Sequence, residues 1–274
     1  MTPTNGAGYM SLYLTKARQA VGCALCLILL SGWAAAVEYT LVTGKDSYPP
    51  FSGEDLPNGG LVTEIIQAVL ARSGVGVKIE YLPWNRGFRL AEAGDVLGTF
   101  PYVKDRDRLD AFHFSSPLYV TVELFFVRRD EDIKYASDED LAGLVLCRPL
   151  GYSLESVQPL LDKGVVKLWT PNDLETCFQL LESKRVHLVP IGVRVGRSTT
   201  ERLFGDSEHF RVLSKPLQVN GLHLIISRRR ADAKTIMTDF NKTLSEMWKE
   251  GVIRKIYDKH HTQMPTDELL KAAP

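Results

Sequence analysis

The sequence predicts an α/β protein in which two βαβαβ halves are joined by two extended crossings. Runs rich in β-branched and aromatic residues alternate with segments of helical spacing over residues 38–120, and the same alternation returns over residues 143–215. An isolated β run follows each half, at residues 122–127 (VELFFV) and 221–226 (GLHLII). Such alternation indicates mostly parallel sheets flanked by helices. We therefore expect a hinged molecule of two lobes, with one continuous doubly wound sheet as the alternative.

The first half is expected to contain three strands and two helices. Pro49 and Pro50 cannot continue the first strand, because proline removes a backbone donor and fixes the chain direction. Apolar residues then recur at helical spacing, which predicts the first helix. The expected strands are residues 37–43, 77–82 and 96–100, and the expected helices are residues 61–70 and 88–93.

The second half repeats this order and is followed by a closing helix. Asp173 and the residues just before it predict the start of one helix by capping. The closing helix is expected at about residues 232–249, ended by Gly251. The expected strands of this half are residues 144–148, 165–169 and 186–191, and the expected helices are residues 154–161 and 174–181.

Composition excludes two classes of protein. The 274 residues are 45% hydrophobic and 24% charged, with 33 Lys and Arg against 33 Asp and Glu. A nucleic-acid-binding protein would show a basic excess, and a disordered chain would have too few apolar residues to form a core. The sequence therefore predicts a folded protein whose partner is not a nucleic acid.

Residues 1–36 have the organisation of a secretory signal peptide. Lys16 and Arg18 precede an apolar run at residues 20–30, and a small-x-small ending follows up to Ala36. The run is about half the ~20 residues of a membrane-spanning helix, although an uncleaved anchor is the alternative. Cleavage after Ala36 would leave 238 residues with a net charge of −2 in the periplasm, from 31 basic and 33 acidic residues.

Several motifs occur along the chain in the same order as in a known protein family. Residues 104–119 (KDRDRLDAFHFSSPLY) resemble the T-x-E-R-x-x-x-x-x-F-S-x-P-Y stretch of the bacterial extracellular solute-binding proteins of family 3, the periplasmic receptors typified by the amino-acid-binding proteins of ABC importers. Residues 48–51 (YPPF) are similar to the family's Y-x-P-F loop. Residues 60–70, 141–153 and 240–256 resemble its first helix, its L-x-G-x-x-V-x-x-x-x-G-x-S element and its closing helix.

This resemblance implies a periplasmic-binding-protein type II fold with a ligand cleft between two lobes. Lobe 1 would comprise residues 37–124 and 222–262, lobe 2 would comprise residues 125–221, and residues 263–274 would form a C-terminal tail. Ligands of such sheets lie at the carboxyl ends of the strands. The implied mechanism is closure of the two lobes on a two-strand hinge.

Cys147 and Cys177 remain after signal removal and are a candidate disulfide in an oxidising compartment, with two separate buried thiols as the alternative. The implied fold favours the disulfide. Cys147 would lie on the first strand of lobe 2, and a right-handed crossover would place the helix of Cys177 beside it.

The resemblance also implies the ligand-binding residues. Arg108 matches the family arginine that pairs with the ligand's α-carboxylate through a planar fork, and Arg106 is the alternative. Gly151 would open a turn, and Ser153 would lie at the following helix N-terminus, where backbone N–H groups attract anions. The aromatic residues expected to line the cleft are Tyr48, Phe51, Trp84 and Tyr102.

At two positions this sequence differs from the ligand-binding residues of the family. The family commonly has a threonine where this chain has Val103, and amino-acid binders have an aspartate for the α-ammonium near Pro190 and Ile191, where this chain has no acid. An unpaired buried ammonium is costly, so a backbone carbonyl or Glu123 would have to replace that acid.

Sequence signatures of an enzyme are absent. The six histidines have no metal-binding spacing such as HExxH, and no G-x-S-x-G or P-loop occurs. We therefore expect a monomeric binding protein without a cofactor or metal that delivers a carboxylate-bearing solute, with an amino acid as one candidate, to an inner-membrane ABC permease. A periplasmic enzyme of the dehydratase kind or a sensory ligand-binding module is the alternative.

Overall fold

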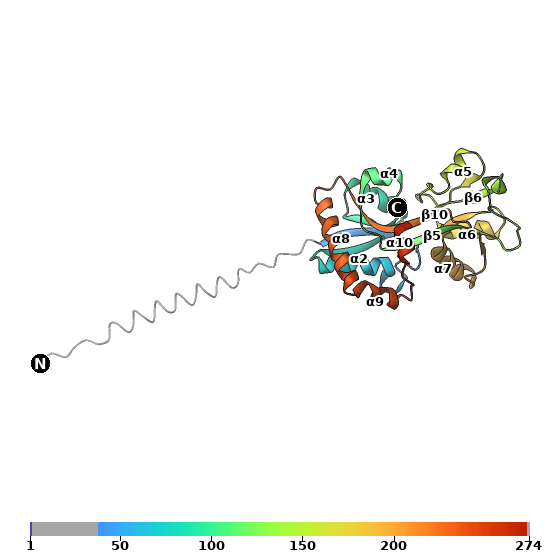
Figure 1. Cartoon of the computed structure of the whole chain (residues 1–274). Helices are drawn as coiled ribbons and strands as arrows, with labels where there is room; N and C mark the ends of the chain where they lie inside the picture. The colour runs from blue at the N-terminus through green and yellow to red at the C-terminus, as the bar shows by residue number, and fades with distance from the viewer. Residues whose placement is uncertain (2–37, 273–274) are drawn as a thin grey trace. The chain divides into compact units, whose positions relative to one another are not determined.

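A computed structural model describes Met1 and residues 38–272 of the chain (Figure 1). The signal peptide predicted at residues 1–36, apart from Met1, lies outside the described residues. Within the described part, no helix has the length and apolar character needed to cross a membrane.

A mixed sheet forms the framework of the fold. Its strands are ordered β2-β1-β3-β10-β5-β8, with β4 paired to β10 and β9 paired to β5. β1 is parallel to β2 and β3, whereas β10 and β5 are antiparallel to their neighbours. The strands are β1 (Glu38–Gly44), β2 (Gly76–Leu82), β3 (Gly98–Tyr102), β4 (Phe112–Phe114), β5 (Tyr119–Val127), β8 (Val189–Gly192), β9 (Arg211–Val212) and β10 (Gln218–Ser227).

β5 and β10 are the two isolated β runs that the sequence predicted, and both are longer than expected. They pair with each other from Tyr119 opposite Leu222 to Glu123 opposite Gln218. Figure 1 shows α2, α3, α4 and α8 around one end of these strands, and α5, α6, α7 and β6 around the other. β5 and β10 therefore connect two groups of elements.

The three helices predicted for this part of the chain are present as α2 (Leu61–Arg72), α3 (Trp84–Ala93) and α8 (Ala233–Lys249). α2 buries its apolar stripe of Leu61, Ile65, Ile66, Val69 and Leu70, as its spacing predicted. α3 begins earlier than expected, and α4 was not predicted. The helices around this part are η1 (Pro57–Gly59), α2 (Leu61–Arg72), α3 (Trp84–Ala93), α4 (Arg106–Ala111), α8 (Ala233–Lys249), α9 (Val252–Lys259) and α10 (Asp267–Ala272). The expected tail at residues 263–274 thus contains a short helix.

The second half has a separate two-stranded parallel sheet of β6 (Val145–Cys147) and β7 (Lys167–Trp169). Asp173 caps α6 as predicted, because its carboxylate accepts a hydrogen bond from the Thr176 N–H (2.7 Å). α7 was not predicted. The helices here are η2 (Asp138–Leu141), α5 (Gln158–Asp162), α6 (Leu174–Glu182) and α7 (Val193–Phe204).

The helix expected from residue 154 is the clearest error in this half. α5 begins only at Gln158, so Ser153 does not lie at a helix N-terminus. Pro159 has no N–H to donate to the carbonyl four residues earlier, which opposes a longer helix. The Ser153 carbonyl instead accepts a hydrogen bond from Arg148 Nε (2.9 Å), and the Ser153 hydroxyl accepts one from the Glu155 N–H (3.3 Å).

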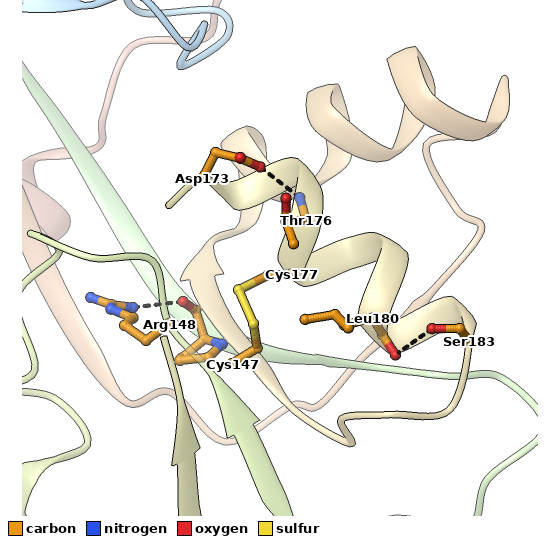
Figure 2. Close-up of a disulfide and its surroundings, with 8 residues drawn as sticks. Cys147, Arg148, Asp173, Thr176, Cys177, Leu180 and Ser183 are labelled. Atoms are coloured by element: carbon orange, nitrogen blue, oxygen red, sulfur yellow. Dashed lines mark hydrogen bonds between the residues drawn. A yellow bond between two sulfur atoms is a disulfide. The ribbon is translucent and has the colours of Figure 1, made fainter. Parts of the chain in front are cut away.

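A disulfide joins Cys147 at the end of β6 to Cys177 in α6, with Cα atoms 5.5 Å apart (Figure 2). Both residues are fully buried. The pairing implied by the resemblance is therefore confirmed, and the alternative of two separate thiols is wrong. Figure 2 shows Arg148 directly after Cys147, with its side chain pointing away from the disulfide. The bond thus fixes the strand from which Arg148 projects.

Removing the disulfide is expected to lower the free energy of unfolding by about 3–4 kcal/mol, because the bond closes a loop of sequence separation 30 and limits the unfolded chain. Urea unfolding of Cys147→Ala/Cys177→Ala against the oxidised protein measures this difference. A reductant should destabilise the parent protein by about the same amount as the double substitution does, and it should leave the stability of the double variant unchanged. Equal unfolding midpoints of the oxidised protein and the double variant would contradict the prediction.

His223 on β10 is a buried titratable group whose ring centre lies 5.5 Å from that of Phe114 on β4. Its Nδ1 lies 2.7 Å from the Ser115 carbonyl oxygen, so this nitrogen carries the proton, and Nε2 is buried without a partner among the described residues. Burial lowers the pKa of His223 to about 4, and the charge of Lys104 adds to the shift. The folded protein therefore contains neutral His223 over a range in which the unfolded chain binds a proton.

We expect acid to destabilise the protein through this group. An unfolded histidine titrates near ~6.5, so stability present above that pH should fall progressively toward pH 4, by about 3 kcal/mol at most. Urea unfolding at several pH values between these limits, for the parent and for His223→Gln, measures the effect. The variant should show a shallower loss, since the carboxylate contributions are common to both proteins. Parallel curves would show that His223 does not contribute.

Candidate functional site

Arg108 is the central buried charge of the candidate site, and α4 positions it. Asp105 precedes α4, and its carboxylate accepts a hydrogen bond from the Arg108 N–H (2.9 Å) and lies 3.2 Å from Nη1. The guanidinium donates to the carbonyl oxygens of Val103 (3.1 Å) and Gly151 (3.0 Å), and 8% of the residue is exposed. Because a guanidinium has five N–H donors, these contacts leave donors for an anionic ligand.

The surroundings of Arg108 strengthen its attraction for an anion. Burial lowers the pKa of its guanidinium, Asp105 and Tyr102 oppose that shift, and the positive charge of Arg148 adds to it. Arginine nevertheless remains protonated in proteins. Arg108 is therefore a permanent cation with little water around it, where its interaction with a carboxylate is less screened than at the surface.

Aromatic rings from both groups of elements surround this charge. The Tyr102 ring lies 4.9 Å from the Arg108 guanidinium carbon, which is a cation–π distance. The Trp84 ring centre lies 5.8 Å from that of Tyr102, 6.1 Å from that of Tyr48 and 6.4 Å from that of Tyr152. A Cβ at Gly44, at the end of β1, would overlap the Trp84 indole, so glycine allows the indole to lie there.

The three tyrosines remain protonated donors at neutral pH. Burial raises the pKa of Tyr102 to about 12, although Arg108 opposes the shift. Burial also raises the pKa values of Tyr48 and Tyr152 above the ordinary tyrosine value. A hydroxyl that keeps its proton can donate a hydrogen bond to a carboxylate or hydroxyl of a ligand.

Two adjoining cavities meet at these residues. The inner cavity has a volume of about 60 Å³ and the outer one about 820 Å³. The residues that line both are Trp84, Tyr102, Arg108, Gly151, Tyr152 and Ser153. A ligand group held in the inner cavity would therefore have space to continue into the outer one.

An ion pair forms one wall of the inner cavity. Arg148 Nη1 donates to Glu123 Oε1 (2.7 Å) and to the Pro190 carbonyl (2.6 Å). Glu123 Oε1 also accepts from the Ser156 hydroxyl (2.7 Å), and Asn220 Nδ2 lies 3.4 Å from Oε2. Exposure is 5% for Glu123 and 4% for Arg148. Glu123 lies opposite Gly192 in the β5–β8 pairing, so its carboxylate lies beside the strand end where the sequence has no acid.

The structure brings most of the expected site residues together. Tyr48, Trp84, Tyr102, Arg108, Gly151 and Ser153 line the inner cavity. Phe51 does not: it is fully buried in the core, with its ring centre 4.5 Å from that of Tyr119 and 6.1 Å from that of Tyr48. Phe51 therefore packs in the core against Tyr48, which itself lines the cavity. Arg106, the alternative to Arg108, is exposed.

Sequence reasoning missed Arg148, Tyr152, Thr121 and Asn220, which also line the inner cavity. Arg148 had a usable signal, because it is the last residue of the strand expected at residues 144–148, and ligands of parallel sheets lie at the carboxyl ends of strands. Tyr152 lies between Gly151 and Ser153, which were both predicted as site residues. Thr121 and Asn220 have no local signal, since they face the cavity only through the pairing of β5 with β10.

The donor set does not favour a metal. No group of three or more His, Cys, Asp or Glu residues within the described ranges could hold a metal ion. The inner cavity combines two guanidinium groups with aromatic rings, a composition suited to a small organic anion.

A cavity lined by aromatic rings and a few buried charged groups is typical of sites that bind small solutes. The family model of bacterial extracellular solute-binding proteins, family 3, matches residues 41–263. The chain belongs to this family. The mixed sheet agrees with the periplasmic-binding-protein type II fold of its structural neighbours. A sequence search of curated proteins finds no match.

Solved structures confirm the fold at low sequence identity. The substrate-binding protein of an amino acid ABC transporter is 19% identical with a TM-score of 0.69, covering 82% of this chain and 100% of that one. A histidine kinase sensor domain with similarity to periplasmic binding proteins is 18% identical with a TM-score of 0.72, covering 84% and 98%. The ancestral amino-acid-binding protein that preceded cyclohexadienyl dehydratase is 23% identical with a TM-score of 0.66, covering 81% and 94%.

Proposed function

We propose that the protein is an exported receptor that captures a small carboxylate-bearing solute and delivers it to an ABC importer in the inner membrane. The observation that carries this proposal is the buried guanidinium of Arg108, which lines both cavities and is surrounded by tyrosine and tryptophan rings. Membership of an extracellular solute-binding family supports the location and the role.

Binding would proceed by closure of two lobes. The proposed lobes are residues 37–124 with 222–262, and residues 125–221, and β5 and β10 would act as the hinge between them. The hydrogen bond from Arg108 to the Gly151 carbonyl would then cross from one lobe to the other. A ligand can favour the closed state only by binding it more tightly than the open one.

Each site residue has a distinct role in this proposal. Arg108 would hold the carboxylate, while Tyr48, Trp84 and Tyr102 would contact the organic part of the solute. Gly151 and Ser153 would complete the site from the opposite lobe, since both line the two cavities. Phe51 would act indirectly by packing behind Tyr48.

The direct test is a thermal-shift screen of the purified protein against amino acids, hydroxy acids, other organic acids and oligopeptides. A bound solute should raise the melting temperature in a concentration-dependent way. The bound compound should then be recovered chemically unchanged after prolonged incubation. A product in that sample would replace the receptor role with an enzymatic one.

Delivery requires a separate measurement. Uptake of the identified solute should fall when the gene is deleted and return when the protein is restored, since an importer depends on its receptor. If deletion left uptake intact but abolished a transcriptional response to the solute, the protein would be a sensory module. Both outcomes are read from the same strain.

A further inference from the structure

The charges of the inner cavity limit the chemistry of its ligand. Its lining contains two guanidinium groups, Arg108 and Arg148, and Glu123 is the one acidic residue among the described residues that line it. Asp105 also pairs with Arg108, but it lines the outer cavity rather than the inner one. The inner lining alone therefore has an excess of one positive charge.

Glu123 is already occupied by the protein's own cation. Arg148 reaches both of its oxygens, at 2.7 Å and 3.4 Å, and the Ser156 hydroxyl and Asn220 amide supply further donors. Both members of the pair are nearly fully buried, so neither can exchange its partner for water without opening the site. An ammonium group beside Glu123 would have to displace Arg148 or lie next to its positive charge.

The uncharged groups of the cavity also favour a ligand without an ammonium group. Trp84 lines the inner cavity, and its indole N–H is buried without a hydrogen-bond partner among the described residues. The hydroxyls of Tyr48, Tyr102 and Tyr152 retain their protons because burial raises their pKa values. The guanidinium and indole N–H groups of this lining can only donate, so they are better satisfied by a ligand that supplies acceptors than by one that adds three further N–H donors.

We infer that the solute is an organic acid with an apolar or aromatic body and no ammonium group beside its carboxylate, and that Arg148 is the residue that excludes amino acids. The inference rests on the proposed function. The carboxylate accepts from the guanidinium donors that Asp105, Val103 and Gly151 leave free on Arg108, and the body packs against the aromatic rings. An α-ammonium would be buried without an available carboxylate, which is unfavourable.

Matched pairs of compounds test the inference by calorimetric titration. L-Phenylalanine is compared with L-phenyllactate, L-leucine with its α-hydroxy acid, and L-alanine with L-lactate, so that each pair differs only in ammonium against hydroxyl. The hydroxy acid should bind more tightly by about tenfold or more in the pair that fits best. Equal or tighter binding of the amino acid would overturn the inference and leave the proposed function intact. Binding of neither member of any pair, together with no stabilising compound in the thermal-shift screen, would overturn both.

Two variants identify the residue responsible. Arg148→Met frees the Glu123 carboxylate and should reduce or reverse the preference for the hydroxy acid, whereas Arg254→Met, an exposed arginine on α9, is the control and should retain it. Arg148→Met must first show the circular dichroism spectrum of the parent. If it fails to fold, Glu123→Gln is the second variant: it removes the one acidic side chain that the described residues contribute to the inner lining, and it should strengthen the preference. An unchanged preference in the folded variant would remove Arg148 from the inference.

Discussion

Replacing Arg108 with alanine is expected to weaken binding of the solute by about two to three orders of magnitude. Truncating one partner of a buried, hydrogen-bonded charge pair costs about 2–5 kcal/mol, and each ~1.4 kcal/mol is tenfold in affinity. Isothermal titration of Arg108→Ala with the solute identified by thermal shift measures the loss. Arg108→Lys should recover only part of it, because an ammonium cannot form the planar fork of a guanidinium.

Arg106→Ala is the matched control for this prediction. Arg106 lies two residues earlier on the same short helix and carries the same charge, but it is exposed and lines the outer cavity without lining the inner one, so its removal should change affinity by a small factor only. Circular dichroism of both variants shows whether α4 is retained. If Arg106→Ala abolished binding and Arg108→Ala did not, the assignment of the carboxylate-binding residue would be wrong.

The sequence predicted the site best where the signal was local. Arg108 could be found because its motif is contiguous, and the aromatic residues could be found because they follow expected strands. Arg148 stands at the end of an expected strand, but its pairing could not be predicted, since its partners Glu123 and Pro190 are 25 and 42 residues away in the sequence. The pairing of β5 with β8, together with the bridge between Leu146 of β6 and Leu188, brings them together. Long-range charge pairs carry no periodic signal that a single sequence reveals.

The errors in secondary structure have similar physical causes. α7 was missed because its buried residues are Val195, Gly196, Thr199 and Thr200, which form no apolar stripe. The helix expected at residues 154–161 was predicted to begin too early, because Leu154 and Leu161 have helical spacing. In the structure Arg148 instead holds the Ser153 carbonyl in a turn. In both cases tertiary contacts decide the local conformation. The division into lobes at residues 124–125 and 221–222 remains a prediction.

Removing either member of the Glu123–Arg148 pair is expected to lower the free energy of unfolding by about 3–5 kcal/mol without ligand, because the other charge is left buried and unpaired. Glu123→Leu would leave the Arg148 guanidinium with only carbonyl partners, and Arg148→Met would leave the Glu123 carboxylate with a hydroxyl and an amide. Urea unfolding of the two single variants at neutral pH measures both losses, with Arg254→Met as the exposed control.

The double variant Glu123→Leu/Arg148→Met separates stability from selectivity. A buried ion pair replaced by apolar residues of similar volume is often close to neutral, so the double variant should be more stable than either single variant, and the double-mutant cycle should give a coupling of several kcal/mol. The double variant should nevertheless have lost the charges that distinguish a hydroxy acid from an amino acid, because neither Arg148 nor Glu123 remains in the cavity. Additive losses would show that the two side chains do not act as a pair. Recovered stability together with lost selectivity would indicate that this chain retains a buried ion pair for recognition rather than for folding.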